Sequence, residues 1–597
     1  MMRALIEQGV IVPTAAGWTL QGNIDALPTT IEGVITARLD RLGTVIRELV
    51  QVASVVGRRF ELSILRGLAD DNVVQHLDTL TTADVVLPDQ VAAELTYLFK
   101  HTLTRDVAYE GILYARRRDL HRRVAARIEE IYGDSVSDVL PVLARHYARA
   151  EEWERALHYY RAAGRAAQEG YFNVEAIAHY TTALEILPQF AALDPAVAIE
   201  LHERLGYVQT QAGEYPAALA AFTTALDLLR AAPNPNVDAE ARLLRHVATV
   251  HERRAEYDAA FTALNSALAL LGDDDSLERV RALLLVAGLH QRQSRPRETI
   301  ERAQEGLRLA QKLALKKEQA SAYLQLGGGH RLLGENEQAI EYLNRSAELC
   351  HDINDIVRQA DSYINIANSY TDLGNYQQAV AFFEQAYHIK VSVNDIYGQA
   401  LVLLNSGDVY RKIGDVDHAI ENFHHSVALW QRLGSRLGSA VAYMNLGATL
   451  LIQGAYADAE TYLDHSRGIF HDINVDNFLP ELYRTYAELF FKTGNYVQAL
   501  DYCDFAIAQA QTAAAKSDEG LAELLRSQVI AEFKHWQPAL EAAQRALAIL
   551  QTCDNQQDIV ACLNQLARLT VEHAPTLHRQ YVAQAQQYQA LAESVQW

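Results

Sequence analysis

The chain has 597 residues and a formal net charge of −22 at pH 7. This length exceeds one ordinary hydrophobic core, so several domains or an array of repeats is expected. Almost all of the excess negative charge falls after residue 132. A surface this acidic repels nucleic acid phosphates, so the partner is expected to be a protein or peptide, with nucleic acid unlikely.

Several classes of site and location have no sequence signal. There is no long apolar run of membrane-spanning length and no signal-peptide pattern at the N-terminus, so a cytoplasmic protein with no membrane partner is expected. The four scattered cysteines predict neither disulfides nor zinc. No G-x-x-x-x-G-K-[ST], G-x-S-x-G or H-E-x-x-H occurs, so no catalytic, cofactor-binding or metal residues are predicted and no enzyme is expected.

The first 132 residues do not repeat. Residues 1–12 are expected to form a short helix and a strand, and residues 14–30 a loop or small hairpin. Short helices are predicted at 30–43, 45–56, 60–68 and 72–83. Residues 85–87 and 94–99 then alternate like a β-hairpin with a turn at Pro88-Asp89, before helical periodicity returns at 106–131. Short helices followed by a hairpin fit a winged-helix fold.

The motifs of this region resemble a known family. They are Ile35-Thr36-Ala37-Arg38-Leu39-Asp40-Arg41-Leu42, Ala53-Ser54-Val55-Val56-Gly57-Arg58-Arg59-Phe60, Phe99-Lys100-His101 with Asp106-Val107-Ala108-Tyr109, and Leu120-His121-Arg122-Arg123-Val124-Ala125. Over residues 27–130 they are similar to the region after the ATPase core in bacterial signal-transduction ATPases with numerous domains (STAND, AAA-type regulators). That resemblance implies a winged helix that joins an ATPase to a tetratricopeptide sensor.

The same resemblance divides the N-terminal region. Residues 1–29 would be the remnant of an ATPase lid or linker, and residues 30–132 the winged-helix-like module. The ATPase is absent from the chain, so the sequence matches either the C-terminal part of such a regulator or a stand-alone protein. A missing or separate ATPase domain is therefore a possible partner.

A basic cluster lies near the end of this region and has two interpretations. Its members are Arg116, Arg117, Arg118, Arg122, Arg123 and Arg127. They could contact DNA, as expected of a transcriptional regulator. Alternatively, they form a solvated helix face that pairs with the acidic array or with a missing ATPase domain, and this second interpretation is favoured.

A 40-residue repeat dominates the rest of the chain. A small residue, a polar residue and an alanine five positions after the first recur at Gly334, Gly374, Gly414, Gly454 and Gly494. A second motif, a small residue inside a large apolar stripe, keeps the same phase at Leu326-Gly327, Ile366-Ala367, Ser406-Gly407, Leu446-Gly447 and Tyr486-Ala487. Such a period means stacked helical units, whose glycines end first helices and whose alanines allow close packing.

These repeats resemble the tetratricopeptide repeat in a form with longer helices. The resemblance covers residues 139–575 and implies an all-α solenoid superhelix. Residues 576–597, rich in glutamine, are predicted to form a polar capping helix. Tyr323, Tyr363, Tyr443 and Tyr483 form a ladder assigned to packing, and Gly327-Gly328-Gly329 is assigned to close helix contact instead of phosphate binding.

An amide ladder is the best candidate for a binding groove. Asn365, Asn405 and Asn445 precede the small-residue motif in three successive units, with Gln325 in the unit before them. The resemblance places this position in the concave groove, where an amide can both donate to and accept from an extended peptide. Further groove candidates are Asn368, Asp408, Arg331, Arg411 and Arg484. The alternative interpretation is a set of ordinary solvated helix residues.

The sequence therefore predicts an all-α tetratricopeptide scaffold with an N-terminal winged-helix-like module. Its expected function is protein or peptide binding in the sensor region of a bacterial signalling regulator. The alternative is a transcriptional regulator that contacts DNA through the winged-helix-like module.

Overall fold

The computed structural model describes residues 11–14, 17–20, 30–89, 95–190, 192, 194–473, 475–513, 515–553 and 556–594. The chain divides into two compact units, residues 1–205 and residues 206–597. The division falls inside one helix of the predicted repeat region, α11 (Pro195–Ala212). Most of the predicted lid remnant, residues 1–29, lies outside the described residues.

The first unit begins with an antiparallel strand pair followed by a small α/β module. Strand β1 (Ile11–Thr14) pairs with β2 (Gly17–Leu20), with Ile11 opposite Leu20. The module's helices are α2 (Ile31–Asp40), α3 (Thr44–Val56), α4 (Leu62–Leu65), α5 (Val73–Thr82), α6 (Thr102–Glu110) and α7 (Tyr114–Tyr132). Its strands β3 (Arg59–Glu61), β4 (Val86–Asp89) and β5 (Thr96–Phe99) form an antiparallel sheet in the order β3-β5-β4.

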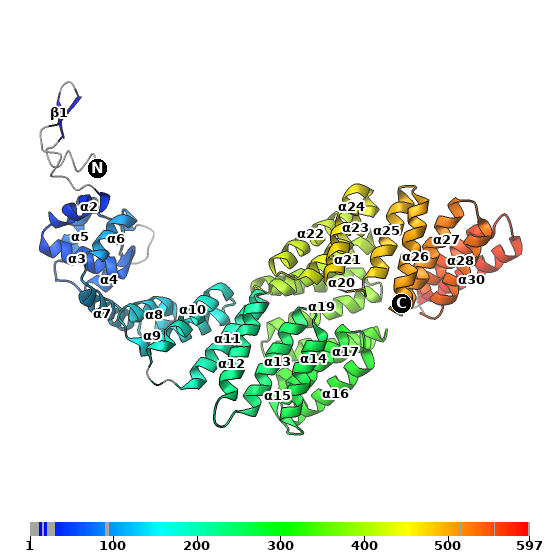
Figure 1. Ribbon diagram of the computed structural model, residues 1–597, viewed down its shortest axis with the longest axis horizontal. Coiled ribbons are helices and arrows are strands. Elements are labelled where there is room, and N and C mark those ends of the chain that lie inside the picture. The colour runs from blue at the N-terminus through cyan, green and yellow to red at the C-terminus, as the bar shows by residue number, and fades with distance from the viewer. Residues whose placement is uncertain are drawn as a thin grey trace. The chain divides into compact units, whose positions relative to one another are not determined.

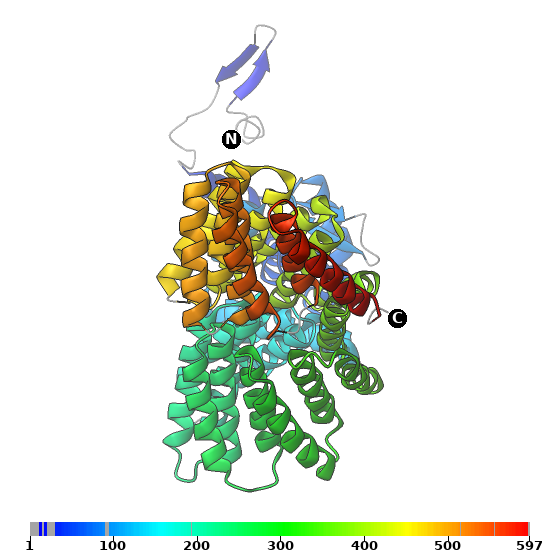
Figure 2. The ribbon, with the colours of Figure 1, turned by 90° about the vertical axis from the view of Figure 1, so that its right-hand side faces the viewer.

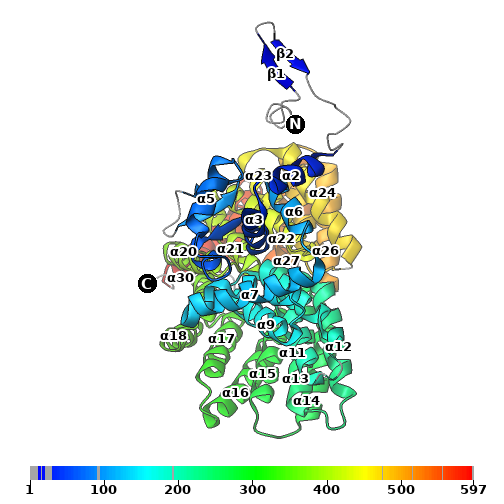
Figure 3. The same cartoon turned by 90° about the vertical axis from the view of Figure 1, so that its left-hand side faces the viewer.

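Helix α3 is the centre of this module. Its second half is buried from Leu49 to Val56, and it contacts α5, α6 and α7 (Figures 1 and 3). Phe60 of β3 packs edge-on against Phe99 of β5 with ring centroids 5.5 Å apart. An apolar helix face and the apolar face of the sheet thus bury each other.

Two local predictions in this module were wrong. Residues 60–68 were expected to form one helix, but residues 59–61 form β3 and the helix starts only at Leu62. The expected turn at Pro88-Asp89 belongs to β4. A proline can lie in this strand because β4 is at the edge of the sheet, where a missing N–H breaks no ladder. The winged-helix assignment itself stays a prediction.

The remainder of the first unit is helical. It contains η2 (Gly133–Val139), α8 (Leu140–Arg149), α9 (Trp153–Glu169), α10 (Asn173–Glu185), η3 (Leu187–Gln189) and the first part of α11. Helices α8 and α9 pack as one antiparallel pair, and α9 packs in turn on α10.

The second unit is a run of helical hairpins (Figures 1 and 2). After α11 and α12 (Tyr215–Arg230), the first helices of the hairpins are α13 (Val237–Arg253), α15 (Leu277–Arg292), α17 (Lys316–Leu332), α19 (Ile356–Asp372), α21 (Ile396–Ile413), α23 (Arg436–Gln453), α25 (Leu479–Lys492), α27 (Lys516–Glu532) and α29 (Gln556–Thr570). The second helices are α14 (Tyr257–Leu271), α16 (Pro296–Lys312), α18 (Asn336–Asp352), α20 (Tyr376–Ser392), α22 (Val416–Arg432), α24 (Tyr456–Ile473), α26 (Tyr496–Thr512), α28 (Trp536–Leu550) and α30 (Pro575–Ser594). The prediction of an all-α solenoid is confirmed.

The predicted turn glycines end the first helices as expected. Gly334, Gly374, Gly414, Gly454 and Gly494 all have φ between 75° and 84°. The residue after each glycine donates its N–H back into the last turn, as Asn375 does to the Tyr370 carbonyl at 2.8 Å. This left-handed cap is the conformation that glycine adopts without a steric penalty.

The predicted small residues lie where helices approach most closely. Ala339, Ala379, Ala419, Ala459, Ala499 and Ala539 are fully buried. A Cβ at Gly407 would lie 2.8 Å from the Phe423 ring, and one at Gly447 would lie 2.8 Å from Leu463 Cγ. The hairpins that contain Gly407 and Gly447 thus have a small residue on both helices where the two helices meet, which lets the helices pack closely.

The first helices line the inner side of the second unit. Consecutive first helices pack directly on one another from α13 to α29. In the described part of the chain, consecutive second helices do not pack on one another as extensively as consecutive first helices do. Helices that crowd together lie on the shorter, concave side of a curved stack, so the exposed face of the first helices forms the inner surface.

Candidate ligand-binding face

The three predicted asparagines occupy one register on three consecutive first helices. Asn365 lies on α19, Asn405 on α21 and Asn445 on α23, and each is half-buried. In α19 the half-buried residues Asp361, Asn365 and Asn368 are four and three positions apart, which places them on one helix face between buried stripes. The three asparagines therefore form a row across adjacent helices. We call this row the amide row.

The amide groups are held by short-range hydrogen bonds. Asn365 Nδ2 donates to the Asp361 carbonyl at 2.9 Å, and Asn445 Nδ2 donates to the Val441 carbonyl at 3.1 Å. Asn405 Nδ2 instead donates across the helix boundary to Asn368 Oδ1 at 3.2 Å. Each bond uses one of the two N–H groups of the amide and orients the side chain without using all of its donors and acceptors.

The charged groove candidates form ion pairs along the same surface. Arg331 on α17 contacts Asp372 on α19 at 2.9 Å. Asp408 contacts Arg411 at 2.5 Å and Lys412 at 3.0 Å on its own helix. Burial alone would raise the pKa of Asp408, but the two cations outweigh burial and hold the pKa below its usual value. The carboxylate therefore stays ionised at neutral pH.

Arg484 lies apart from the amide row. It occupies the register that holds Leu324, Ile364, Leu404 and Met444 in the preceding first helices. It lies 4.0 Å from Glu481 on its own helix, and its positive charge acts on Asp518 of α27. Burial raises the pKa of Asp518, and the positive charge of Arg484 opposes that rise. Arg484 thus interacts with an acidic residue near the start of a later helix and not with the amide row.

Gln325 and the glycine triplet belong to helix packing. The amide of Gln325 lies over Gly288 of α15, where a Cβ would be 3.5 Å from Nε2. Cβ atoms at Gly327, Gly328 and Gly329 would lie 2.5 Å from Leu343, 2.2 Å from Gln291 and 2.7 Å from Ile300. All three glycines lie inside α17, which confirms their assignment to close packing.

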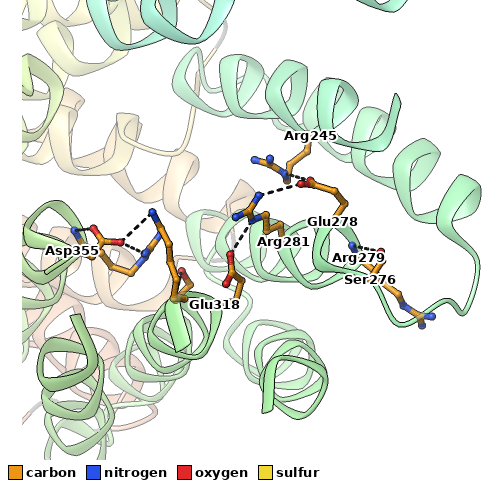
Figure 4. A network of polar contacts seen from close by, with 10 residues as sticks. Arg245, Ser276, Glu278, Arg279, Arg281, Glu318 and Asp355 are labelled. Carbon is orange, nitrogen blue, oxygen red and sulfur yellow. Dashed lines mark hydrogen bonds and ion pairs between the residues drawn. The ribbon is translucent and has the colours of Figure 1, made fainter. Parts of the chain in front are cut away.

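An ion-pair network that the sequence did not reveal links neighbouring inner helices (Figure 4). Arg245 of α13 contacts Glu278 of α15 at 3.0 Å, and Arg281 joins Glu278 at 3.1 Å to Glu318 of α17 at 2.9 Å. Lys317 then contacts Asp355, the N-cap of α19, at 3.4 Å. The side chains of Glu278 and Glu318 are only 7–8% exposed.

This network connects four consecutive first helices. Nearly buried carboxylates are stable only when each has a partner, so the pairs fix how one helix sits on the next. The available sequence signal was the 40-residue spacing of Glu278 and Glu318 together with Arg281 three residues after Glu278. Nothing local indicated that α13 would supply Arg245.

The tyrosine ladder packs inside the hairpins. Tyr323 lies 6.2 Å from Tyr342, and Tyr443 lies 5.8 Å from Tyr462, measured between ring centroids. The Tyr443 hydroxyl accepts a hydrogen bond from Gln431 at 2.6 Å. The assignment of this ladder to packing is confirmed.

The basic cluster of the first unit is engaged with the protein itself. Arg118 contacts Glu151 at 2.8 Å, Arg123 donates to the Leu68 carbonyl at 3.1 Å, and Arg127 donates to the Ser63 carbonyl at 3.3 Å. Arg116 contacts Glu48, Arg117 contacts Glu110, and Arg122 contacts Asp119. All six arginines thus have internal partners.

The position of these arginines bears on the DNA alternative. They lie on α7, which follows the sheet, whereas the helix pair that precedes the hairpin ends in α5. Helix α5 contains no lysine or arginine. A DNA-binding helix-turn-helix reads the groove with its second helix, so this arrangement favours the interpretation as a helix face paired with acidic residues.

Three of the four cysteines are buried. Burial raises the pKa of Cys350 to about 11 and of Cys503 and Cys562 to about 12, so these thiols stay protonated. Within the described ranges no group of three or more His, Cys, Asp or Glu side chains could hold a metal ion. No described helix is both long and apolar enough to cross a bilayer.

Comparison with known proteins identifies the repeats. The family model for the tetratricopeptide repeat matches residues 196–273, 318–390 and 398–470. A curated relative, an uncharacterized protein of Rhizobium meliloti (strain 1021), is 29% identical over 177 residues, which is 29% of this chain and 17% of that protein. The matched part of the chain thus spans about a sixth of its relative's length.

Three solved structures resemble the chain in fold. A Rap protein complexed with competence and sporulation factor is 16% identical, with a TM-score of 0.44 over 61% of this chain and 99% of that one. A STAND protein with a tetratricopeptide repeat sensor from Pyrococcus horikoshii is 13% identical, with a TM-score of 0.40 over 76% and 67%. Yeast Tom70 is 15% identical, with a TM-score of 0.35 over 77% and 96%.

The matched segments contain tetratricopeptide repeats, as the sequence predicted. An array of this kind is a protein-binding scaffold, because its stacked helices present one extended concave surface.

Proposed function

We propose that the inner face of α19, α21 and α23 binds an extended peptide or a protein segment through the amide row. One observation carries the proposal. Asn365, Asn405 and Asn445 share a register on three adjacent inner helices and are half-buried there. Side-chain amides spaced along a groove can pair with the backbone of an extended ligand whatever its side chains.

The surroundings of the amide row favour an extended polar ligand. Among the described residues Asn365 Oδ1 accepts no hydrogen bond from the chain, while its Nδ2 is oriented by Asp361. An oriented amide loses little rotational freedom when a ligand binds, which lowers the cost of association. The neighbouring arginines and carboxylates already pair with each other, so no cluster of uncompensated charge selects a strongly charged ligand.

We further propose that the chain is the sensor region of a signalling regulator. Support comes from the motifs in residues 27–130 that resemble the segment between the ATPase and the sensor in STAND proteins. In such an arrangement the groove takes the ligand and the first unit contacts an ATPase domain.

The groove is tested by affinity capture with three forms of the chain. The wild type is compared with a variant in which Asn365, Asn405 and Asn445 are all alanine. The control replaces Asn344, Glu384 and His424, which have the same 40-residue spacing on the second helices and are exposed. Each lost hydrogen bond costs about 1 kcal/mol, so the groove variant should bind the captured partner about a hundredfold more weakly than the wild type does. Equal binding by all three forms would contradict the proposal.

A further inference from the structure

The second unit closes a turn of its superhelix on itself. Arg253, at the end of α13, lies with its guanidinium carbon 3.8 Å from the ring centroid of Tyr397, at the start of α21. Three hairpins separate these residues along the array. A planar guanidinium over an aromatic face is attracted by the ring's negative electrostatic potential. The contact therefore ties the end of one repeat to the start of a distant one.

A second close contact accompanies the first. Gly213, in the turn after α11, lies against Leu433, in the turn after α22. A Cβ at Gly213 would be 2.7 Å from Leu433 Cδ2 and 3.3 Å from its Cα. The backbones of these two turns thus approach each other with no space for a side chain at residue 213. Two independent contacts join the same two regions of the second unit.

The start of α21 is fixed by a buried lysine. Lys390 at the end of α20 is 3% exposed, and its Nζ lies 2.9 Å from Asp395, the N-cap of α21, and 2.5 Å from Asp361 on α19. Burial would lower the pKa of Lys390, but the two carboxylates outweigh burial and raise it. A Cβ at Gly398 would lie 2.6 Å from the Lys390 stem, so the glycine leaves room for the lysine to reach α19.

The same charges connect the distant contact to the groove. Burial would raise the pKa of Asp395, but the positive charges of Lys390 and, to a smaller extent, Arg253 lower it overall. Asp395 therefore interacts electrostatically with both cations. At the other end, Asp361 lies on the inner face one turn before Asn365, whose amide donates to the Asp361 carbonyl. A series of polar and charged groups thus runs from Asn365 through Asp361, Lys390 and Asp395 toward Arg253 and Tyr397.

We propose that Arg253, Tyr397, Asp395 and Lys390 form a latch that holds the superhelical turn closed and couples its closure to the groove. A ligand that contacts Asp361 competes with Lys390 for that carboxylate, which frees Lys390 and weakens its hold on Asp395 and the start of α21. Breaking the latch from the other side changes the spacing of the inner helices that carry the amide row. The coupling to a ligand depends on the proposed function, whereas the latch itself does not.

The latch is tested on the full chain without any ligand. Spin labels are placed at the exposed positions Asp258 and Arg432, on α14 and α22, in a Cys553→Ser background. The three remaining cysteines are buried and stay unlabelled. Distances between the labels are measured by pulsed electron resonance, and helicity is checked by circular dichroism. The wild type should give one narrow distribution.

Replacement of Arg253 decides whether the latch exists. Arg253→Ala should lengthen and broaden the distribution, and Arg253→Lys, which keeps the charge without the planar stacking, should give an intermediate result. Arg254→Ala is the matched control, because Arg254 pairs with Glu256 two residues away and not with a latch residue among those the structure describes, and it should leave the distribution unchanged. Superimposable distributions for Arg253→Ala and the wild type would overturn the latch.

Replacement of Asp361 decides whether the latch is coupled to the groove. Asp361→Asn removes the carboxylate that binds Lys390 and should broaden the same distribution, although residue 361 lies on the inner face. Asp372→Asn is the control, because that carboxylate pairs with Arg331 on the same face and not with the latch. A normal distribution for Asp361→Asn would overturn the coupling. Because no ligand is present, neither result depends on whether the groove binds a peptide.

Discussion

At the scale of single residues, two adjacent glycines of α17 meet different neighbours. The position for a Cβ at Gly327 is blocked by Leu343 Cγ at 2.5 Å, whereas that at Gly328 is blocked by the amide end of Gln291. A branched side chain in a packed hairpin cannot retreat, but the end of a glutamine can rotate away. The same substitution at these two neighbouring positions should therefore have different effects on stability.

We expect Gly327→Ala to lower the free energy of unfolding by about 1–3 kcal/mol through overpacking. Gly328→Ala should leave stability unchanged or raise it by up to about 1 kcal/mol, because alanine is the better helix former. Hydrogen exchange of the amides in α17 and α18 measures both effects. Equal destabilisation by the two variants would show that the contact with Leu343 does not determine the spacing.

The first unit contains a buried pair of histidines. His121 Nδ1 lies 2.9 Å from His146 Nδ1, and the other ring nitrogen of His121 lies 2.9 Å from the Tyr109 hydroxyl. Burial lowers the pKa of His121 to about 4, with Arg149, Arg145 and Arg117 adding to the effect. Burial, His121 and Arg145 lower the pKa of His146 to about 3. Only one Nδ1 of the pair can carry a proton, because the other must accept it.

These shifts give a pH dependence of definite sign. In the unfolded chain both histidines titrate near pH 6.5, so between about pH 6.5 and 4 the unfolded state binds more protons than the folded one. Stability should fall as the pH drops through this range. We expect protection of amides in α7 and α8, corrected for intrinsic exchange, to fall between pH 7 and 5. The double variant His121→Gln, His146→Leu should lose less over the same range, and an equal loss would refute this account.

At the scale of the helical hairpin, the sequence predicted most of the repeat architecture. A fixed period carries this information because each turn glycine and each buried alanine repeats the same local requirement. The small α/β module was predicted less well. Strand β3 has three residues, of which only Phe60 is apolar, and a segment of that length does not distinguish a strand from the first turn of α4.

The break in the tyrosine ladder shows a second local solution. Where other hairpins stack aromatic rings, α21 and α22 carry Leu403 and Asn422. Asn422 Nδ2 donates to Ser406 Oγ at 3.1 Å, so a polar contact takes the place of the rings. The sequence showed the gap in the ladder but not its replacement, because the partner serine belongs to the small-residue motif of the other helix.

The buried alanine ladder predicts a strictly local response. Ala379→Leu places a larger side chain where α19, α20 and α21 meet and should cost about 1–3 kcal/mol. Ala381→Leu, at an exposed position of the same helix, is the control and should be nearly neutral. Because each repeat contacts mainly its neighbours, hydrogen exchange should rise in α19–α21 and not in α27–α29. A uniform rise along the second unit would contradict this prediction.

At the scale of the whole chain, the contacts between distant repeats could not be predicted from the sequence. The amide row follows from the period and from the resemblance to tetratricopeptide repeats. The contact of Arg253 with Tyr397 depends on the rotation between neighbouring hairpins, added up over several hairpins. No local sequence pattern determines this total rotation. The ion pairs of Glu278 and Glu318 were missed for a related reason, since their partners come from adjacent helices.

The central claim is that a ligand lies on the inner face of α19–α23. It is tested most directly by a photoreactive benzoyl-phenylalanine placed at Asn368 on that face, with the same group at Glu384 on α20 as the control. Both positions are on the same hairpin, and only Asn368 neighbours the amide row. We predict a discrete crosslinked species from residue 368 alone, which disappears when Asn365, Asn405 and Asn445 are alanine. Crosslinks from residue 384 but not residue 368, or crosslinks from 368 that survive the triple substitution, would contradict the claim.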